Sequence, residues 1–268
     1  MRYCRFQTAV GIQYGRLENR DGVEMIVELL PPWPENDSPT KRATDRAGFR
    51  PLALTQARLL APVTPSKIIC VGRNYKEHAA EMGNEVPKEP LIFYKPPSSI
   101  VGPGESIQLP PESLTKRVDY EGELALVIGK RCRRLSPGEP TLSYIRGFTC
   151  ANDVSARDLQ KSDSQWTRAK GFDTFCPVGP IVSDEIDPGS VEGVELTTKL
   201  NGEQKQHGNT RDFIFKLDRV LQFITEGITL EPGDLVLTGT PAGVSPMKAG
   251  DIVEVTIAGI GTLKNPVV

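Results

Sequence analysis

Several features that mark particular protein classes are scarce or missing in this sequence. Its 32 Lys and Arg almost balance its 34 Asp and Glu, and the net charge of -2 gives no basic surface for nucleic acid or an anionic membrane. The apolar runs are far shorter than the roughly 20 residues of a membrane-spanning helix. Residues 1–6 lack the apolar stretch of a signal peptide, so we expect a cytoplasmic protein.

Cysteine and histidine are also sparse. The five Cys are scattered and form no Cys-x-x-Cys pair, which predicts reduced, buried thiols rather than a disulfide framework. Only two His occur, and His207 lies in a polar stretch that is expected at the surface. That leaves His78 as the imidazole to consider for catalysis.

Glycine and proline, by contrast, are abundant. The 25 Gly and 23 Pro indicate frequent turns, and they favour many short strands over a helical bundle. We therefore predict a mainly β fold with short helices, of the α+β class. Residues 30–40 are polar and rich in proline, which predicts a loop. A connector near Thr64 divides the chain into a small β-rich domain at 1–63 and a larger domain at 64–268.

Local patterns predict three secondary-structure elements in particular. Residues 196–206 contain an Asn-Gly pair between two strand-like segments, which predicts a hairpin with a type I′ turn. Residues 213–226 have the amphipathic pattern of the one longer helix, with Asp212 as its N-cap. A shorter helix is expected at 75–82.

The most informative motif is a pair of glutamates at the start of an apolar segment. Residues 118–129 predict a β-strand, in which Glu121 and Glu123 point to the same face. Two carboxylates on one face of an apolar strand repel each other and resist burial, and a bound cation would remove both problems. A solvated strand face is the alternative explanation of the pair.

Asp153 is the best candidate for a third ligand. It lies where a predicted strand gives way to a polar turn. Three carboxylates without a neighbouring thiol or imidazole form a hard-oxygen site, which suits Mg²⁺, Mn²⁺ or Ca²⁺ and is poor for Zn²⁺. Coordination positions left free by the protein would be open to substrate oxygens.

Three other segments carry candidate functional groups. If residues 75–82 are helical, His78 and Glu81 are i, i+3 neighbours, and a carboxylate beside an imidazole raises its basicity. Lys170, among aromatic and glycine residues, would bind a carboxylate or stabilise an oxyanion. Residues 238–244 form a Gly-rich turn whose N–H groups and hydroxyls suit an anion. An exposed helix pair, a surface lysine and a plain turn are the respective alternatives.

Together these segments resemble the fumarylacetoacetate hydrolase superfamily. The resemblance implies a mixed β-sandwich roll core with a small β-rich N-terminal domain, usually assembled as a homodimer, with Mg²⁺ or Mn²⁺ bound. Six motifs occur in the family's order, and they are 71–75 with His78 and Glu81, 93–96, 119–125, 152–158, 170–175 and 238–244.

By motif match, the resemblance implies roles for ten residues. The histidine–glutamate pair would activate water or move a proton, on a lid that orders with ligand, and the lysine is the family's pocket lysine. The implied metal ligands are Glu121, Glu123 and Asp153, the reacting groups are His78, Glu81 and Lys170, and the substrate-binding positions are Arg73, Asn74, Gln160 and Thr240.

The chemistry implied by the resemblance begins with a 2-oxo or β-diketo acid that chelates the metal and forms an enolate. Attack by activated water would then hydrolyse a C–C bond, as in acylpyruvates or fumarylacetoacetate, and this is the reaction we predict. Proton transfer alone would make the protein an isomerase or tautomerase of 2-hydroxymuconate-type diacids or oxaloacetate, and loss of a β-carboxylate would make it a decarboxylase. A binding protein with a structural metal is the remaining alternative, but it would need neither His78 nor Lys170.

Overall fold

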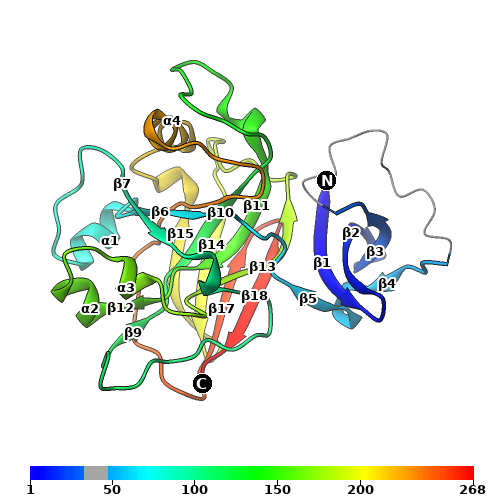
Figure 1. Ribbon diagram of the computed structural model, residues 1–268, viewed down its shortest axis with the longest axis horizontal. Coiled ribbons are helices and arrows are strands. Elements are labelled where there is room, and N and C mark those ends of the chain that lie inside the picture. Colours follow the sequence, from blue (N-terminus) through cyan, green and yellow to red (C-terminus); the bar gives the residue numbers. More distant parts are fainter. Residues whose placement is uncertain (33–47) are drawn as a thin grey trace.

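The structure is a computed structural model that describes residues 1–32 and 48–268, and most of its regular elements are strands (Figure 1). One large sheet runs through the molecule. Its strands are β1 (Arg2–Thr8), β2 (Gly11–Arg20), β3 (Val23–Leu30), β4 (Leu52–Ala53), β5 (Arg58–Leu60), β6 (Ile68–Gly72), β7 (Leu91–Lys95), β8 (Ile100–Val101), β10 (Gly122–Ile128), β11 (Ile145–Asn152), β13 (Cys176–Ser183) and β16 (Leu235–Leu237).

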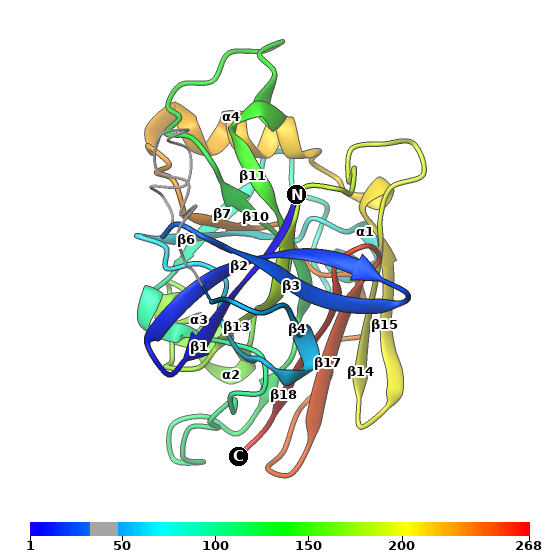
Figure 2. The same cartoon turned by 90° about the vertical axis from the view of Figure 1, so that its right-hand side faces the viewer.

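A second sheet packs against the middle of the large one, and short helices lie around both (Figure 2). The second sheet has the order β15 (Glu203–Asn209), β14 (Glu195–Leu200), β17 (Ile252–Ile257) and β18 (Gly261–Pro266), and a separate pair joins β9 (Val118–Asp119) to β12 (Ser155–Ala156). The helices are α1 (Lys76–Glu81), α2 (Arg157–Ser162), α3 (Thr167–Lys170) and α4 (Leu217–Gly227), with 3-10 turns η3 (Leu54–Gln56), η4 (Pro97–Ser99), η5 (Thr141–Tyr144) and η6 (Thr210–Asp212).

The large sheet is mixed, with the order β4-β3-β2-β1-β13-β11-β10-β16-β6-β7, while β5 pairs with β1 and β8 pairs with β13. Most neighbours are antiparallel, but β16 runs parallel to β6 and β8 runs parallel to β13. The prediction of a mainly β fold with short helices is therefore confirmed.

Strand β10 lies at the centre of this arrangement and is buried on both faces. Leu124 and Leu126 on one face belong to the larger apolar core, which also includes residues of β14 and β17. Ala125 and Val127 on the other face belong to a smaller cluster. Since side chains alternate along a strand, Glu123 lies on the same face as this smaller cluster.

The N-terminal strands continue the large sheet, because β1 is hydrogen-bonded to β13 with Tyr3 opposite Val182. In Figure 1 they lie at one end of the molecule, while α1, α2 and α3 gather at the other. The division into domains at 1–63 and 64–268 stays a prediction. The predicted loop at 30–40 falls mostly outside the described residues.

The predicted hairpin is confirmed, because β14 and β15 pair in antiparallel fashion around Asn201 and Gly202. Both turn residues have positive φ, 54° and 82°, as a type I′ turn requires. The helix predicted at 75–82 is also present as α1.

The start of the longer helix was predicted wrongly. Helix α4 begins at Leu217 rather than at 213, and Asp212 belongs to η6 instead of capping α4. The reason is tertiary. The backbone N–H of Ile214 donates to the carbonyl of Asn74, and the N–H of Phe215 donates to the Asn74 side chain, so this segment is held outside the helix.

The five Cys are all buried and free, as expected for reduced thiols. In the described part of the chain, no helix combines the length and apolarity needed to span a bilayer. The cytoplasmic location stays a prediction.

Candidate metal centre and active site

Candidate functional side chains lie where the ends of four neighbouring strands of the large sheet meet. The end of β11 lies beside the start of β10, and these positions carry Asp153 and the paired glutamates. The end of β16 lies beside the start of β10, and it leads to Thr240. Strand β6 runs parallel to β16 and ends next to Arg73. Residues that are far apart in the sequence therefore meet at one place.

Glu121, Glu123 and Asp153 are brought together there. All three are buried, and one oxygen from each lies within 4.8 Å of the other two. The three carboxylates therefore cluster as the sequence predicted, and their role as metal ligands stays a prediction.

Two buried lysines hold Asp153 from both sides. Its Oδ2 accepts a hydrogen bond of 2.8 Å from Lys170, which also donates to Oε2 of Glu121 at 2.7 Å. Its Oδ1 accepts from the Nζ of Lys95 at 2.6 Å. Lys95 also donates to the carbonyl groups of Val154 and Lys170, so its ammonium group is fixed. These contacts fix the orientation of the Asp153 carboxylate.

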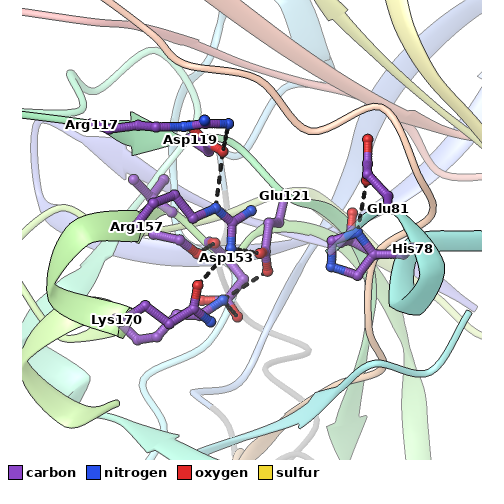
Figure 3. A network of polar contacts seen from close by, with 12 residues as sticks. His78, Glu81, Arg117, Asp119, Glu121, Asp153, Arg157 and Lys170 are labelled. Atoms are coloured by element: carbon purple, nitrogen blue, oxygen red, sulfur yellow. Dashed lines mark hydrogen bonds and ion pairs between the residues drawn. The ribbon is translucent and has the colours of Figure 1, made fainter. Parts of the chain in front are cut away.

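Arg157 joins this cluster to a fourth carboxylate, Asp119 (Figure 3). Its NH1 group lies 2.6 Å from Oε1 of Glu121, and its Nε donates to Asp119 at 2.9 Å. Asp119 also accepts two hydrogen bonds from Arg117. The remaining NH2 group of Arg157 is buried and has no hydrogen-bond partner in the described part of the chain. This group is therefore available to an anionic ligand.

The electrostatics differ between the two glutamates. Burial alone would raise the pKa of Glu121, but the charges of Lys170 and Arg157 outweigh it and lower that pKa far below its usual value. Burial, followed by the negative charges of Asp153 and Glu121, raises the pKa of Glu123 well above its usual value. No described Lys or Arg forms an ion pair with Glu123, which accepts a hydrogen bond from the N–H of Gly239 at 2.7 Å.

This surplus of negative charge fits a divalent cation. Burying a carboxylate without a positive partner is unfavourable, and a cation shared with its two neighbours would remove that cost. The three donors are all carboxylate oxygens, and no thiol or imidazole belongs to the cluster in the described residues. Such a donor set suits Mg²⁺ or Mn²⁺. The residues present therefore fit the metal expected from the sequence.

His78 and Glu81 form a hydrogen-bonded pair on α1. The Nδ1 atom of His78 lies 3.1 Å from Oε2 of Glu81, and Oε1 of Glu81 accepts from the N–H of Gly243 at 3.0 Å. The second ring nitrogen, Nε2, is left for another partner. In Figure 3 the imidazole ring of His78 points toward the Glu121 side chain. The positive charge that His78 can carry also acts on the Glu121 carboxylate.

A cavity of about 270 Å³ lies over the carboxylates. His78, Lys170, Thr240, Gln160 and Arg73 all contribute to its wall, as do the three carboxylates. Of the ten residues predicted from the sequence, eight therefore line one cavity. Glu81 does not line the cavity but is hydrogen-bonded to His78.

Besides Glu81, Asn74 is the predicted residue that does not line this cavity. Its side-chain amide donates to the carbonyl groups of Thr238 and Phe215 and accepts from the N–H of Phe215. Both donors and the acceptor are used within the protein. Asn74 therefore fixes the loop after β6 to two distant segments instead of facing a ligand.

Lys95, Arg157 and Asp119 were missed as site residues by the sequence reasoning. All three lie inside motifs that carried the family resemblance, and that position was the available signal. Arg157 also follows Asp153 by four residues at the start of α2. What the sequence did not reveal is that each of the three is buried and paired with a charge from another segment.

Comparison with known proteins places this chain in a family. The family description Fumarylacetoacetate (FAA) hydrolase C-terminal matches residues 67–268, and the description Rv2993c-like, N-terminal matches residues 1–62. The chain therefore belongs to the fumarylacetoacetate hydrolase family, and its fold is the α+β fold of that family.

Several known proteins are similar over most of the chain. Oxaloacetate tautomerase YisK of Bacillus subtilis is 40% identical over 238 residues, which cover 85% of this chain and 78% of that protein. The crystal structure of 2-hydroxyhepta-2,4-diene-1,7-dioate isomerase from Mycobacterium marinum is 43% identical with a TM-score of 0.85, covering 100% of this chain and 98% of that one. Fumarylacetoacetate hydrolase from Exiguobacterium antarcticum is 37% identical with a TM-score of 0.81, covering 100% and 99%.

Proposed function

We propose that this protein is a divalent-metal-dependent tautomerase that interconverts the enol and keto forms of 2-oxo diacids such as oxaloacetate. The observation that carries the proposal is the position of His78, hydrogen-bonded to Glu81, in the wall of a cavity that also contains three clustered carboxylates. Such a site has one group for moving a proton and one place for a cation. An enol–keto conversion requires no more than these.

The names of two relatives support this choice. One is an oxaloacetate tautomerase and another is an isomerase of a seven-carbon 2-hydroxy diacid. Both reactions move a proton without breaking a C–C bond. They support tautomerisation or isomerisation better than the C–C hydrolysis that we predicted from the sequence.

In the proposed reaction, a bound Mg²⁺ or Mn²⁺ held by Glu121, Glu123 and Asp153 would supply positive charge beside the developing enolate. Lys170 adds a second positive charge at the same end of the cavity. Burial would lower the pKa of Lys170, but Asp153 and Glu121 raise it above its usual value, so its ammonium group stays charged. It therefore stabilises negative charge on the 2-oxygen without giving up its proton.

His78 is the proposed proton carrier. In the enol-to-keto direction, the 2-hydroxyl group releases its proton to solvent as the enolate forms, C3 gains a proton from His78, and His78 regains one from solvent. With Nδ1 committed to Glu81, the Nε2 atom of His78 is the position that gives or takes the proton at C3. Glu81 fixes the ring through its own bond to Gly243. The buried NH2 group of Arg157, which has no partner in the described residues, would bind a carboxylate oxygen of the substrate.

C–C hydrolysis of an acylpyruvate- or fumarylacetoacetate-like compound is the second candidate. It is favoured by the similarity to the Exiguobacterium hydrolase and by the suitability of a histidine–glutamate pair for activating water. Hydrolysis needs a water placed against a carbonyl carbon in addition to the groups named above. The two reactions can be distinguished by testing which substrate the protein consumes.

The test compares two substrates with Mg²⁺ or Mn²⁺ present. Conversion of enol-oxaloacetate to the keto form is followed by the loss of enol absorbance, and cleavage of acetylpyruvate is followed by the appearance of pyruvate. We expect a metal-dependent acceleration of the enol conversion that disappears with a chelator, and acetylpyruvate cleavage at least about 100-fold slower, equivalent to about 2.7 kcal/mol in the barrier.

Rapid acetylpyruvate cleavage with no acceleration of the enol conversion would establish the hydrolase instead. If neither reaction depends on the metal, the proposed role of the three carboxylates is wrong.

A further inference from the structure

Two cations in the cavity wall have no acidic partner. Arg73 follows β6 and Lys161 lies on α2, and both line the cavity. Neither forms an ion pair with any of the described residues. In contrast, Lys170 and Arg157 in the same wall are each paired with buried carboxylates. The cavity thus has an end where the cations are paired with carboxylates of the protein and a side where positive charge is left over.

The backbone and an aromatic ring hold Arg73 in place. Its φ of +58° is a left-handed conformation that a non-glycine residue rarely adopts. Its guanidinium carbon lies 5.9 Å from the centre of the Trp166 ring, within the range of a cation–π contact. The preceding residue is Gly72, where a Cβ would lie only 3.1 Å from Trp166. Gly72 therefore lets the ring approach, and the ring supports the Arg73 side chain.

The same aromatic ring connects Arg73 to the carboxylate end of the cavity. Trp166 packs edge-to-face on Phe93, with 5.3 Å between ring centres and an interplanar angle of 73°. The Nζ atom of Lys170 lies 5.1 Å from the centre of the Phe93 ring. Lys170, Phe93, Trp166 and Arg73 therefore form a continuous row along the wall. A molecule held by its 2-oxo acid at the Lys170 end can extend along two flat rings and reach an unpaired guanidinium.

Gln160 is placed to support an anion on this side. Its Oε1 accepts from Arg157 at 2.9 Å, and its two N–H donors have no hydrogen-bond partner among the described residues. Gln160 and Lys161 are adjacent on α2 and both line the cavity. The donors on this side are therefore an amide, an ammonium and a guanidinium, a set that recognises a carboxylate.

We infer that Arg73 and Lys161 form the subsite for the second carboxylate of the substrate, and that they determine the preference of the protein for 2-oxo diacids over 2-oxo monoacids. The inference rests on the proposed function in taking the 2-oxo acid group to lie at the carboxylate end. It adds which residues bind the other end of the substrate. Phe93 and Trp166 select a flat chain between the two ends.

The test uses a matched pair of unreacting ligands, 2-oxoglutarate and 2-oxopentanoate. They share the 2-oxo acid group and the chain length, and they differ in a terminal carboxylate against a methyl group. Binding to the full-length protein with Mg²⁺ is measured by isothermal titration calorimetry. We expect the wild-type protein to bind the diacid about 10- to 100-fold more tightly, the range for hydrogen bonds to a charged group.

The variants remove the charge and keep the fold. Lys161→Gln changes an exposed side chain, and Arg73→Asn uses a residue that tolerates positive φ. In the double variant the preference for the diacid should fall to about threefold or less, while the affinity for 2-oxopentanoate stays unchanged. Arg73→Lys should keep part of the preference. Lys76→Gln, an exposed lysine on α1 outside the cavity wall, is the matched control and should keep all of it.

The outcomes separate this inference from the proposed function. A wild-type protein that shows no preference or binds neither ligand, or a double variant that keeps the preference or loses both affinities equally, would overturn the subsite. If the enol conversion is catalysed in such a case, the proposed function still stands. If the preference depends on Arg73 and Lys161 but no enol conversion is found, the subsite stands and the proposed reaction fails.

Discussion

The two ends of the cavity differ in how their charges are satisfied. At the carboxylate end, Lys170 lies 2.7 Å from Glu121 and 2.8 Å from Asp153, and Lys95 lies 2.6 Å from Asp153. Along the wall, Arg73 and Lys161 have no acidic partner among the described residues. Charges that are paired within the protein fix the geometry of the site. Charges that are left unpaired next to a cavity are available to a ligand.

Glu123 is the exception at the carboxylate end. It is buried beside two other carboxylates without a positive partner in the described part of the chain, and its pKa is raised accordingly by burial and by Asp153 and Glu121. The unpaired Glu123 therefore requires a cation such as a metal ion, and the unpaired Arg73 and Lys161 require an anion such as a carboxylate. A metal ion chelated by a diacid would satisfy both requirements.

The largest expected effect comes from Glu123→Gln, which removes the unpaired charge at nearly constant size. Metal-dependent turnover should fall by about 10³-fold or more, because the bound ion supplies several kcal/mol of charge stabilisation. The Mg²⁺ affinity measured by calorimetry should fall as well. The melting temperature of the metal-free protein should stay the same or rise, since a repelled charge is gone.

Glu203→Gln in the exposed β14–β15 hairpin is the control and should change none of these quantities. Wild-type metal affinity in Glu123→Gln would show that the cation is bound elsewhere.

A second, smaller effect is expected from His78→Gln. The enol conversion should slow by about 10²- to 10⁴-fold, the usual contribution of a positioned proton-transfer group. Binding of Mg²⁺ and of oxalate should remain within about threefold of wild type, about 0.65 kcal/mol, because His78 is not one of the three clustered carboxylates. Turnover is measured by stopped-flow absorbance of the enol.

Glu81→Gln sharpens this result, because it keeps His78 but weakens the bond that orients its ring. Its rate should lie between those of His78→Gln and the wild type. If His78→Gln keeps the wild-type rate at saturating substrate, another group carries the proton.

The smallest effect is expected from Asp119→Asn. Asp119 pairs with both Arg157 and Arg117, so its loss frees the guanidinium of Arg157 to shift. The KM for oxaloacetate should rise by about tenfold, the equivalent of one charge-assisted hydrogen bond, while kcat changes less than about threefold.

Arg117→Gln is the matched control for this prediction. The side chain of Arg117 is 53% exposed, so its removal should change KM by less than about threefold, as for other exposed ion pairs. A large fall in kcat for Asp119→Asn would contradict a role limited to holding Arg157.

Predictions from the sequence succeeded where the cause was local. The Asn201-Gly202 turn and the i, i+3 pair of His78 and Glu81 each depend on a few neighbouring residues. The single strand predicted at 118–129 is instead two strands, β9 and β10, with Glu121 in the break between them. The start of α4 failed because Asn74, far away in the sequence, binds the segment just before the helix.

The same limit applied to the site. The three clustered carboxylates were found from spacing and family motifs, but their positive partners were not. Lys95 reaches Asp153 across 58 residues of sequence, and Lys170 reaches Glu121 across 49. No periodic pattern spans such separations. Asn74 was predicted to bind substrate because its motif did not reveal the distant backbone groups to which its amide is hydrogen-bonded.

By itself, the sequence determined which chemical groups this protein brings to its site, because side-chain direction in a strand or a helical turn repeats over two to four residues. The tertiary structure alone decided which charges are neutralised and which are left for a ligand. Electrostatic balance depends on distances between segments that only folding brings together. That is why Glu123, Arg73 and Lys161 became distinct from the other charged residues only once the strands and helices around them were in place.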